Sequence, residues 1–178
     1  MNKKLNIIGI NGSASENSSN LAILNQISEL GKPEFNLTII NNLTELPHFK
    51  TELTDHNVPE KIIEFRSLIE NADGIIICTP EYVFSIPSGL KNALEWCVST
   101  VVFSDKPIGL ITASAKGEKG HEELKLIMET IQTKFTDDTT LLIQGIKGKI
   151  NSNGELVDHA TKNQLEKFVE SFNQLIKH

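Results

Sequence analysis

A stretch rich in hydroxyl and amide side chains near the N-terminus has the residue types and the position to bind an anion. It runs from Asn11 to Asn20, after the apolar run Leu5 to Ile10 and before residues spaced like one face of a helix. A strand, a loop and a helix start in this order gather backbone N–H groups at the positive end of a helix dipole. The side chains that add donors are those of Ser13, Ser18, Ser19 and Asn20. The pattern predicts a phosphate-binding loop.

Two common nucleotide-binding motifs are excluded for this loop. A nucleoside-triphosphate loop needs a Lys after a glycine at the helix start, and the sequence has none there. The GxGxxG pattern needs three glycines, and the stretch contains only Gly12. The loop therefore suits a phosphate monoester held by neutral donors. The competing interpretation is an ordinary turn whose Ser and Asn side chains cap a helix.

Composition limits the classes of partner. The 178 residues suit one domain over 1–178 with a sizeable core. A formal net charge of −6 provides no basic field, so neither nucleic acid nor an anionic membrane surface is expected as a partner. No apolar stretch is long enough to cross a bilayer, and the first residues lack the long apolar region of a signal peptide. We therefore expect a cytoplasmic protein.

Cysteine and histidine usage gives no support for a metal site. Cys78 and Cys97 lie on an apolar run and on an apolar helix face, and the five histidines are scattered without the spacing of metal ligands. We therefore predict neither a metal centre nor a disulfide framework.

Strand-like and helix-like patterns alternate along the chain. Continuous apolar runs, of which Asp73 to Thr79 is an example, are typical of strands covered on both faces. Apolar residues at helical spacing lie between such runs, for example from Leu90 to Val101. The predicted strands are residues 5–10, 37–40, 73–79, 107–112 and 139–144. Right-handed crossovers between them produce a parallel sheet between two helical layers, with ligands at the carboxyl ends of the strands.

Two further loops leave strand ends at the same edge of the predicted sheet. Residues 80–87 carry Glu81, Tyr82 and Phe84 between two prolines, and residues 113–120 are rich in Ser, Lys and Gly. An aromatic ledge beside a phosphate loop suits a flat ring with a phosphate tail. The alternative is that the two aromatic side chains pack beneath their own loop.

Two segments resemble motifs of the NAD(P)H-dependent FMN reductases, a family that includes bacterial chromate, quinone and azo-dye reductases. Residues 12–20 resemble its GSxRxxSxN phosphate loop, and residues 80–96 resemble its PEYNxSxPxxLKNAxDW segment. The resemblance implies a flavodoxin-like α/β fold. This fold is a three-layer sandwich whose five-stranded parallel sheet has the order 2-1-3-4-5.

By position, the resemblance implies FMN-binding residues on all three loops. The predicted phosphate loop contributes Ser13, Ser18 and Asn20, with Ser19 beside them and Ser15 at the position of the family arginine. The residues expected to border the isoalloxazine are Pro80, Glu81, Tyr82, Val83 and Ser85. The residues expected to close its far side are Ser114, Ala115, Lys116 and Gly117.

The chain departs from the family pattern at two of these positions. Ser15 replaces an arginine and precedes acidic Glu16, so the phosphate loses a charge-assisted hydrogen bond of about 1.5 to 3 kcal/mol. Val83 stands where the family often has an asparagine, which removes a polar side chain near the flavin. We expect either weaker FMN binding or compensation by the charge of Lys116.

The resemblance implies an FMN-dependent oxidoreductase without catalytic side chains, because the flavin carries the chemistry. Hydride would pass from NAD(P)H to FMN and then to a small-molecule acceptor in a ping-pong sequence. The expected acceptors are quinones, flavins, azo dyes or metal ions, and both NADH and NADPH stay open as donors. Two alternatives are a flavodoxin-like FMN electron carrier and a non-catalytic flavin-binding protein.

Self-association is also expected. In the resembling family two chains commonly share the flavin crevice. The predicted helix over residues 90–101 carries Trp96, Val98 and Val101 on more than one side, as burial against a second chain requires. We therefore predict a homodimer or a homotetramer.

Overall fold

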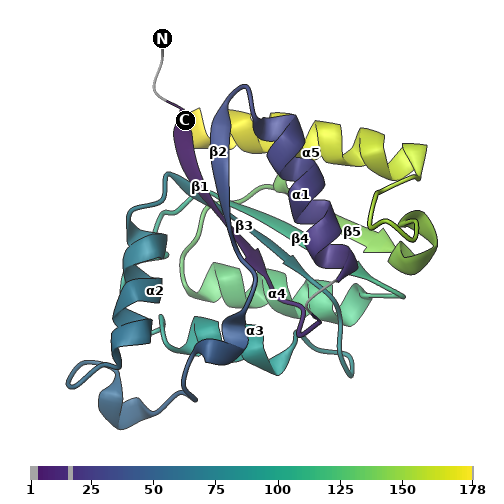
Figure 1. Ribbon diagram of the computed structural model, residues 1–178. Coiled ribbons are helices and arrows are strands. Elements are labelled where there is room, and N and C mark those ends of the chain that lie inside the picture. Colours follow the sequence, from purple (N-terminus) through teal and green to yellow (C-terminus); the bar gives the residue numbers. More distant parts are fainter. Residues whose placement is uncertain (1–3, 16–17, 178) are drawn as a thin grey trace.

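A five-stranded parallel β-sheet forms the middle layer of the molecule (Figure 1). The computed structural model describes residues 4–15 and 18–177, and its strands follow the order β2-β1-β3-β4-β5. The strand bounds are β1 Leu5–Asn11, β2 Phe35–Ile40, β3 Gly74–Thr79, β4 Ile108–Ser114 and β5 Thr140–Gln144. The predicted flavodoxin-like order is confirmed. Its reversal lies between β1 and β3, which is where such sheets bind ligands.

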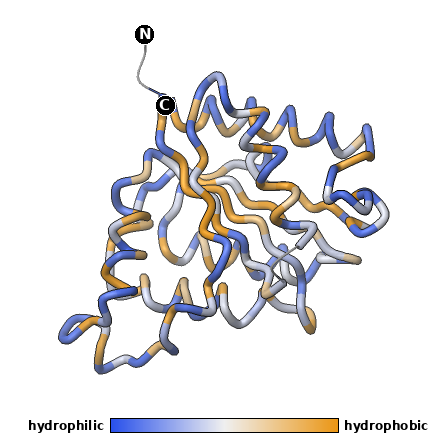
Figure 2. Tube along the Cα trace, viewed as in Figure 1, coloured by the Kyte–Doolittle hydropathy of each residue, from blue (hydrophilic) through white to orange (hydrophobic). Residues whose placement is uncertain are grey.

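Helices cover both faces of this sheet. In Figure 1, α1 (Ser19–Gly31) and α5 (His159–Lys177) lie on one face, and α2 (Glu60–Glu70), α3 (Ser88–Glu95) and α4 (Glu118–Thr130) lie on the other. Each face has its own apolar cluster, and all six residues of β3 are buried between them. Figure 2 shows the apolar strands running through the middle of the molecule. Two-sided burial explains the continuous apolar runs in the sequence.

The helix that follows β3 is shorter than its apolar pattern predicts. α3 ends at Glu95 and turns follow it. At this end the Arg66 guanidinium binds the Trp96 carbonyl, with its Nε 2.8 Å from that oxygen. Trp96 itself is fully buried, so it packs in the core. Val98 and Val101, which were predicted on the helix, lie beyond it and are 64% and 79% exposed.

Strand β4 is longer than predicted. Ala113 and Ser114 were expected in a loop, but they pair in parallel register with Ile143 and Gln144 of β5. The third loop is correspondingly shorter and begins at Ala115. Within the described residues, no helix combines the length and apolar character that crossing a membrane requires.

Candidate functional site

A buried amide at the end of β1 organises the first loop. The Asn11 side chain is fully buried and donates from Nδ2 to the Asn41 Oδ1 at 2.7 Å and to the Ser18 Oγ at 3.2 Å. Its Oδ1 accepts a hydrogen bond from the Ser13 backbone N–H at 3.1 Å. One side chain thus ties both ends of the loop to the segment after β2. No separate role was predicted for Asn11 from the sequence.

The hydroxyl and amide groups at the start of α1 divide between two tasks. Ser18 caps the helix, since its Oγ accepts from the Leu21 N–H at 3.1 Å, and Ser19 is the first residue of α1. Asn20 is 3% exposed and turns inward. Its Nδ2 donates to the Ala113 carbonyl at 3.3 Å, and its Oδ1 accepts from the Cys78 thiol at 3.2 Å. The Asn20 amide therefore links α1 to β3 and β4.

Close backbone packing fixes the beginning of the first loop. The Gly12 N–H donates to the Cys78 carbonyl at 2.9 Å. A Cβ atom on Gly12 would lie 2.5 Å from the Thr79 Oγ1 and 2.9 Å from the Leu90 Cδ2. Only glycine allows this approach of the loop to β3 and α3. Burial also raises the pKa of the Cys78 thiol, which keeps it protonated as a donor.

The second loop contains a tight two-residue turn. Tyr82 and Ser85 exchange backbone hydrogen bonds of 2.9 and 3.1 Å. The central residues Val83 and Phe84 have φ angles of 52° and 61°, the left-handed region that a turn of type I′ requires. Asparagine tolerates this region better than a β-branched residue does. This accounts for the asparagine of the family motif at the position of Val83.

The aromatic residues of the second loop are exposed. Tyr82 is 42% and Phe84 is 74% exposed, so the alternative of packing beneath the loop is wrong. The Tyr82 hydroxyl lies 3.4 Å from the Ser13 Oγ, which brings the first and second loops together.

Other predicted residues of the second loop face α4. Pro80 is buried, and the Glu81 carboxylate accepts from the Gly120 N–H at 2.9 Å. The Ser85 hydroxyl donates to the Glu123 carboxylate at 2.6 Å.

The third loop lies at the end of the neighbouring strand β4. The Ala115 carbonyl accepts from the Gly145 N–H at 3.1 Å, and buried Gly117 has a φ of 92° where the chain turns into α4. The side chain of Lys116 is exposed. Beneath the loop, the His121 Nδ1 lies 3.0 Å from the Thr112 Oγ1. Burial, and next the Lys125 charge, lower the pKa of His121.

A cavity of about 1030 Å³ opens between the first loop, Tyr82 and the start of α3. Ser13 and Ser15 line it, and Lys91 on α3 contributes a positive charge. Of the described residues, those of the third loop are not part of this lining. The structure therefore joins two of the three predicted loops in one cavity. It leaves Ser114 to Gly117 beside it, at the next strand end.

The far wall of the cavity is the segment after β2. The Asn92 Oδ1 accepts from the Phe49 N–H at 2.8 Å, and its Nδ2 donates to the Pro47 carbonyl at 3.1 Å. The Trp96 indole N–H donates to the same carbonyl at 2.8 Å, and its ring meets Phe49 edge to face at 5.3 Å. This segment was not predicted to be part of the site. The motif match at Asn92 and Trp96 could have indicated its involvement, because both side chains bind Pro47.

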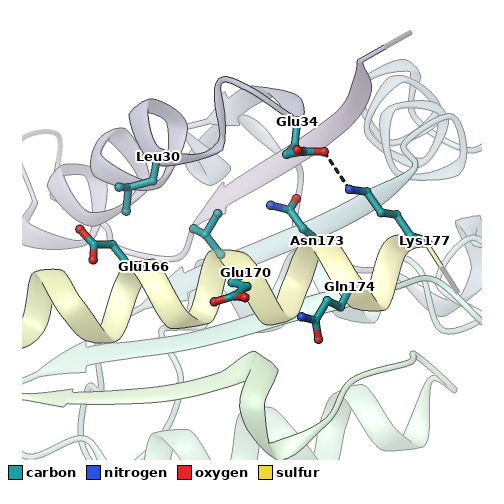
Figure 3. A pocket seen from close by; sticks show the side chains of 8 residues that line it. Leu30, Glu34, Glu166, Glu170, Asn173, Gln174 and Lys177 are labelled. Atoms are coloured by element: carbon teal, nitrogen blue, oxygen red, sulfur yellow. Dashed lines mark hydrogen bonds and ion pairs between the residues drawn. The ribbon is translucent and has the colours of Figure 1, made fainter. Parts of the chain in front are cut away.

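A second, smaller cavity of about 360 Å³ lies between α1 and α5, away from these loops (Figure 3). Three carboxylates, those of Glu34, Glu166 and Glu170, line it, and Lys177 is paired with Glu34 at 2.8 Å. Excess negative charge disfavours a phosphate there. Among the described residues, no group of three or more His, Cys, Asp or Glu could hold a metal ion.

Comparisons with known proteins agree with this arrangement. Residues 5–147 match the family model of the NADPH-dependent FMN reductases. A curated NADH:(hydroxy)cinnamate reductase subunit from Vibrio ruber is 29% identical over 94% of this chain and 85% of its own length. A quinone reductase from Escherichia coli is 23% identical over 99% of this chain and 98% of its own. The chain belongs to the NADPH-dependent FMN reductase family.

Solved structures show the same fold. FerB, a flavoenzyme NAD(P)H:(acceptor) oxidoreductase from Paracoccus denitrificans, superimposes with a TM-score of 0.85 and 23% identity, covering 97% of each chain. Family membership makes the protein an oxidoreductase that uses FMN and reduced nicotinamide, as predicted. The hydroxyl-rich loop, the exposed Tyr82 ring and the adjoining cavity have the chemistry to hold a phosphorylated flat ring.

Proposed function

We propose that this reductase holds FMN across the carboxyl ends of β1, β3 and β4 and reduces a quinone-type acceptor in a ping-pong sequence. Bound FMN supplies hydride chemistry, accepting from NAD(P)H and donating to the acceptor. The observation that carries the proposal is the meeting of Ser13 and Tyr82, 3.4 Å apart, at the mouth of the cavity. This contact supports the proposal because it brings the predicted phosphate loop next to the exposed Tyr82 ring.

The residues of the chain take three roles in this proposal. Hydroxyl and backbone N–H groups of the first loop bind the phosphate, and Asn20 braces that loop from within. Tyr82 and the turn would border the ring, while N–H groups of the third loop would offset negative charge on it. The proposed contact residues are Ser13, Ser15, Ser18, Ser19, Pro80, Glu81, Tyr82, Val83, Ser85, Ser114, Ala115, Lys116 and Gly117.

Besides Lys116, Lys91 could supply the positive charge that is lost where Ser15 replaces the family arginine. It lines the same cavity as Ser13 and Ser15, and its Nζ lies 3.8 Å from the nearest Glu123 oxygen. This long ion pair leaves the ammonium donors able to reach an anionic ligand. Lys116, which was expected to supply this charge, lies on the third loop and does not line the cavity.

The names of relatives support the acceptor class. The Escherichia coli relative is named a quinone reductase, and one from Burkholderia, 27% identical over 94% of both chains, a 2-hydroxy-1,4-benzoquinone reductase. We propose a quinone or another conjugated small molecule as the acceptor of this chain.

We also propose a homodimer formed on the α3 and α4 side of the sheet. Large apolar side chains are exposed on α4 and on the loops before and after α3, where they suit burial against a second copy. They are Tyr82, Val83, Phe84, Val98, Val101 and Leu126. Light scattering at micromolar concentration tests the proposal, and a monomer mass would reject it.

An anaerobic spectral titration tests the proposed reaction. Purified protein is mixed with FMN and then with NADH or NADPH, and the flavin band is followed before and after a quinone is added. Bleaching by the nicotinamide and recovery with the quinone are expected. Binding without bleaching would favour the electron carrier, and no binding would favour a non-catalytic protein.

A further inference from the structure

Two carboxylates connect the second loop to α4 in opposite directions. From the loop, Glu81 accepts the Gly120 N–H at 2.9 Å in the first turn of α4. From α4, the Glu123 Oε2 accepts the Ser85 hydroxyl at 2.6 Å and the Ile86 N–H at 3.0 Å. Both ends of the turn are therefore fastened to the same helix by hydrogen bonds to charged acceptors, the stronger kind of hydrogen bond in proteins.

The turn between these attachments is unfavourable by itself. Val83 and Phe84 both adopt positive φ angles, and their side chains are 93% and 74% exposed. Left-handed backbone is costly for residues other than glycine, and these side chains bury too little surface to offset that cost. The conformation persists only where surrounding contacts impose it.

α4 approaches the loop closely enough to impose that conformation. A Cβ atom on Gly120 would lie 3.1 Å from the Glu81 Cβ and 3.3 Å from the Ser85 carbonyl oxygen. The helix backbone therefore lies directly against the loop, and Glu123, one turn further along, reaches Ser85 from there. Lys91 stands 3.8 Å from the other Glu123 oxygen and keeps a positive charge beside the carboxylate.

We infer that Glu123 is a positioning residue whose carboxylate locks the Tyr82–Ser85 turn in the shape that presents the Tyr82 ring to FMN. Its effect on the turn depends only on the contacts described above. Its effect on the cofactor rests on the proposed function. If the turn is ordered in only a tenth of molecules without Glu123, the apparent FMN affinity falls ten-fold.

The first experiment needs no cofactor, because Tyr82 is the only tyrosine of the chain. Protein labelled with 3-fluorotyrosine gives one ¹⁹F resonance that reports the turn directly. Glu123→Ala is expected to shift or broaden it. Glu122→Ala is the matched control, since neighbouring Glu122 is exposed and pairs only with Lys119 among the described residues. Coincident spectra for Glu123→Ala and the parent protein would overturn the inference.

The second experiment is a double-mutant cycle on FMN affinity. Glu123→Ala is expected to weaken FMN binding about ten-fold when Tyr82 is present. In a Tyr82→Leu background the same substitution should weaken it less than about three-fold. Equal losses in both backgrounds would show that Glu123 does not act through Tyr82. Thermal melts exclude general unfolding, and Glu123→Gln replaces Glu123→Ala if the latter does not fold. Failure of the parent protein to bind FMN rejects the proposed function, while the ¹⁹F result still decides the role of Glu123 in the turn.

Discussion

The first and second loops of the site are held in different ways. The first loop is organised by neutral groups, with buried Asn11 bonded to Ser13, Ser18 and Asn41. The second loop holds an exposed turn in left-handed backbone and is fastened by the carboxylate of Glu123 from α4. In the described residues 11–15 and 18–20 of the first loop, the hydrogen bonds join neutral groups, which suits a loop expected to receive a phosphate. A loop expected to border a ring can be held by carboxylates.

The largest effect is expected from removing the amide that organises the first loop. Asn11→Ala leaves the Ser13 N–H and the Asn41 side chain without their partner, so we expect the free energy of unfolding to fall by about 2 kcal/mol or more. FMN affinity should fall with it. Chemical denaturation and FMN titration measure both. The control Asn25→Ala changes an exposed residue of α1, and a similar loss there would contradict this account.

The next effect concerns the missing arginine of the first loop. Ser15→Arg adds a cation to a cavity-lining position, and we expect FMN affinity to rise about ten-fold, which corresponds to ~1.4 kcal/mol. FMN titration at low and high salt measures it. If affinity is insensitive to salt and to the substitution, neutral donors alone suffice, and neither Lys91 nor Lys116 is needed for compensation.

A pair of glycine substitutions tests the contact between α4 and the second loop. Gly120→Ala places a Cβ 3.1 Å from Glu81, so the overlap should outweigh the gain in helix propensity and destabilise the protein by about 1 kcal/mol. Gly89→Ala in α3 meets nothing closer than 3.8 Å and should stabilise it by up to about 1 kcal/mol. Urea unfolding compares the two. If Gly120→Ala also stabilises the protein, the second loop moves aside without cost and the contact is not tight.

Relief of the turn is expected to have a smaller effect. Val83→Asn puts a residue that tolerates positive φ at this position, so we expect a stabilisation of up to about 1 kcal/mol. FMN affinity should not decrease. The control Val157→Asn changes another exposed valine outside the set of residues with positive φ. Similar shifts in melting temperature for both variants would rule out backbone strain as the cause.

The smallest effect concerns pH at the third loop. The pKa of His121 is lowered by burial and by Lys125, so the unfolded chain takes up the proton more readily than the folded one. Stability should therefore decrease as the pH falls from the ordinary histidine value of about 6.5 through the lower folded value. His121→Asn should flatten this dependence in denaturation curves measured at several pH values. An unchanged slope would assign the dependence to other groups.

The sequence by itself determined the layered fold and the approximate location of the site. Apolar runs such as Gly74 to Thr79 are typical of strands covered on both faces, and their alternation with amphipathic helices favours a parallel sheet that buries both patterns. The carboxyl ends of β1, β3 and β4 must then lie at one edge. This is why the three loops could be predicted together.

Only the tertiary structure decided how the side chains of the site are used. The Asn20 amide bonds to Cys78 and Ala113, and the Glu81 carboxylate accepts from Gly120 of α4, partners that no pattern in the sequence indicates. No sequence pattern indicated that Glu123 supports the second loop, because its partner Ser85 lies 38 positions earlier in the chain. Sequence periodicity reports which face of an element is buried. The pairing of polar groups depends on distances between elements, which arise only when the layers pack.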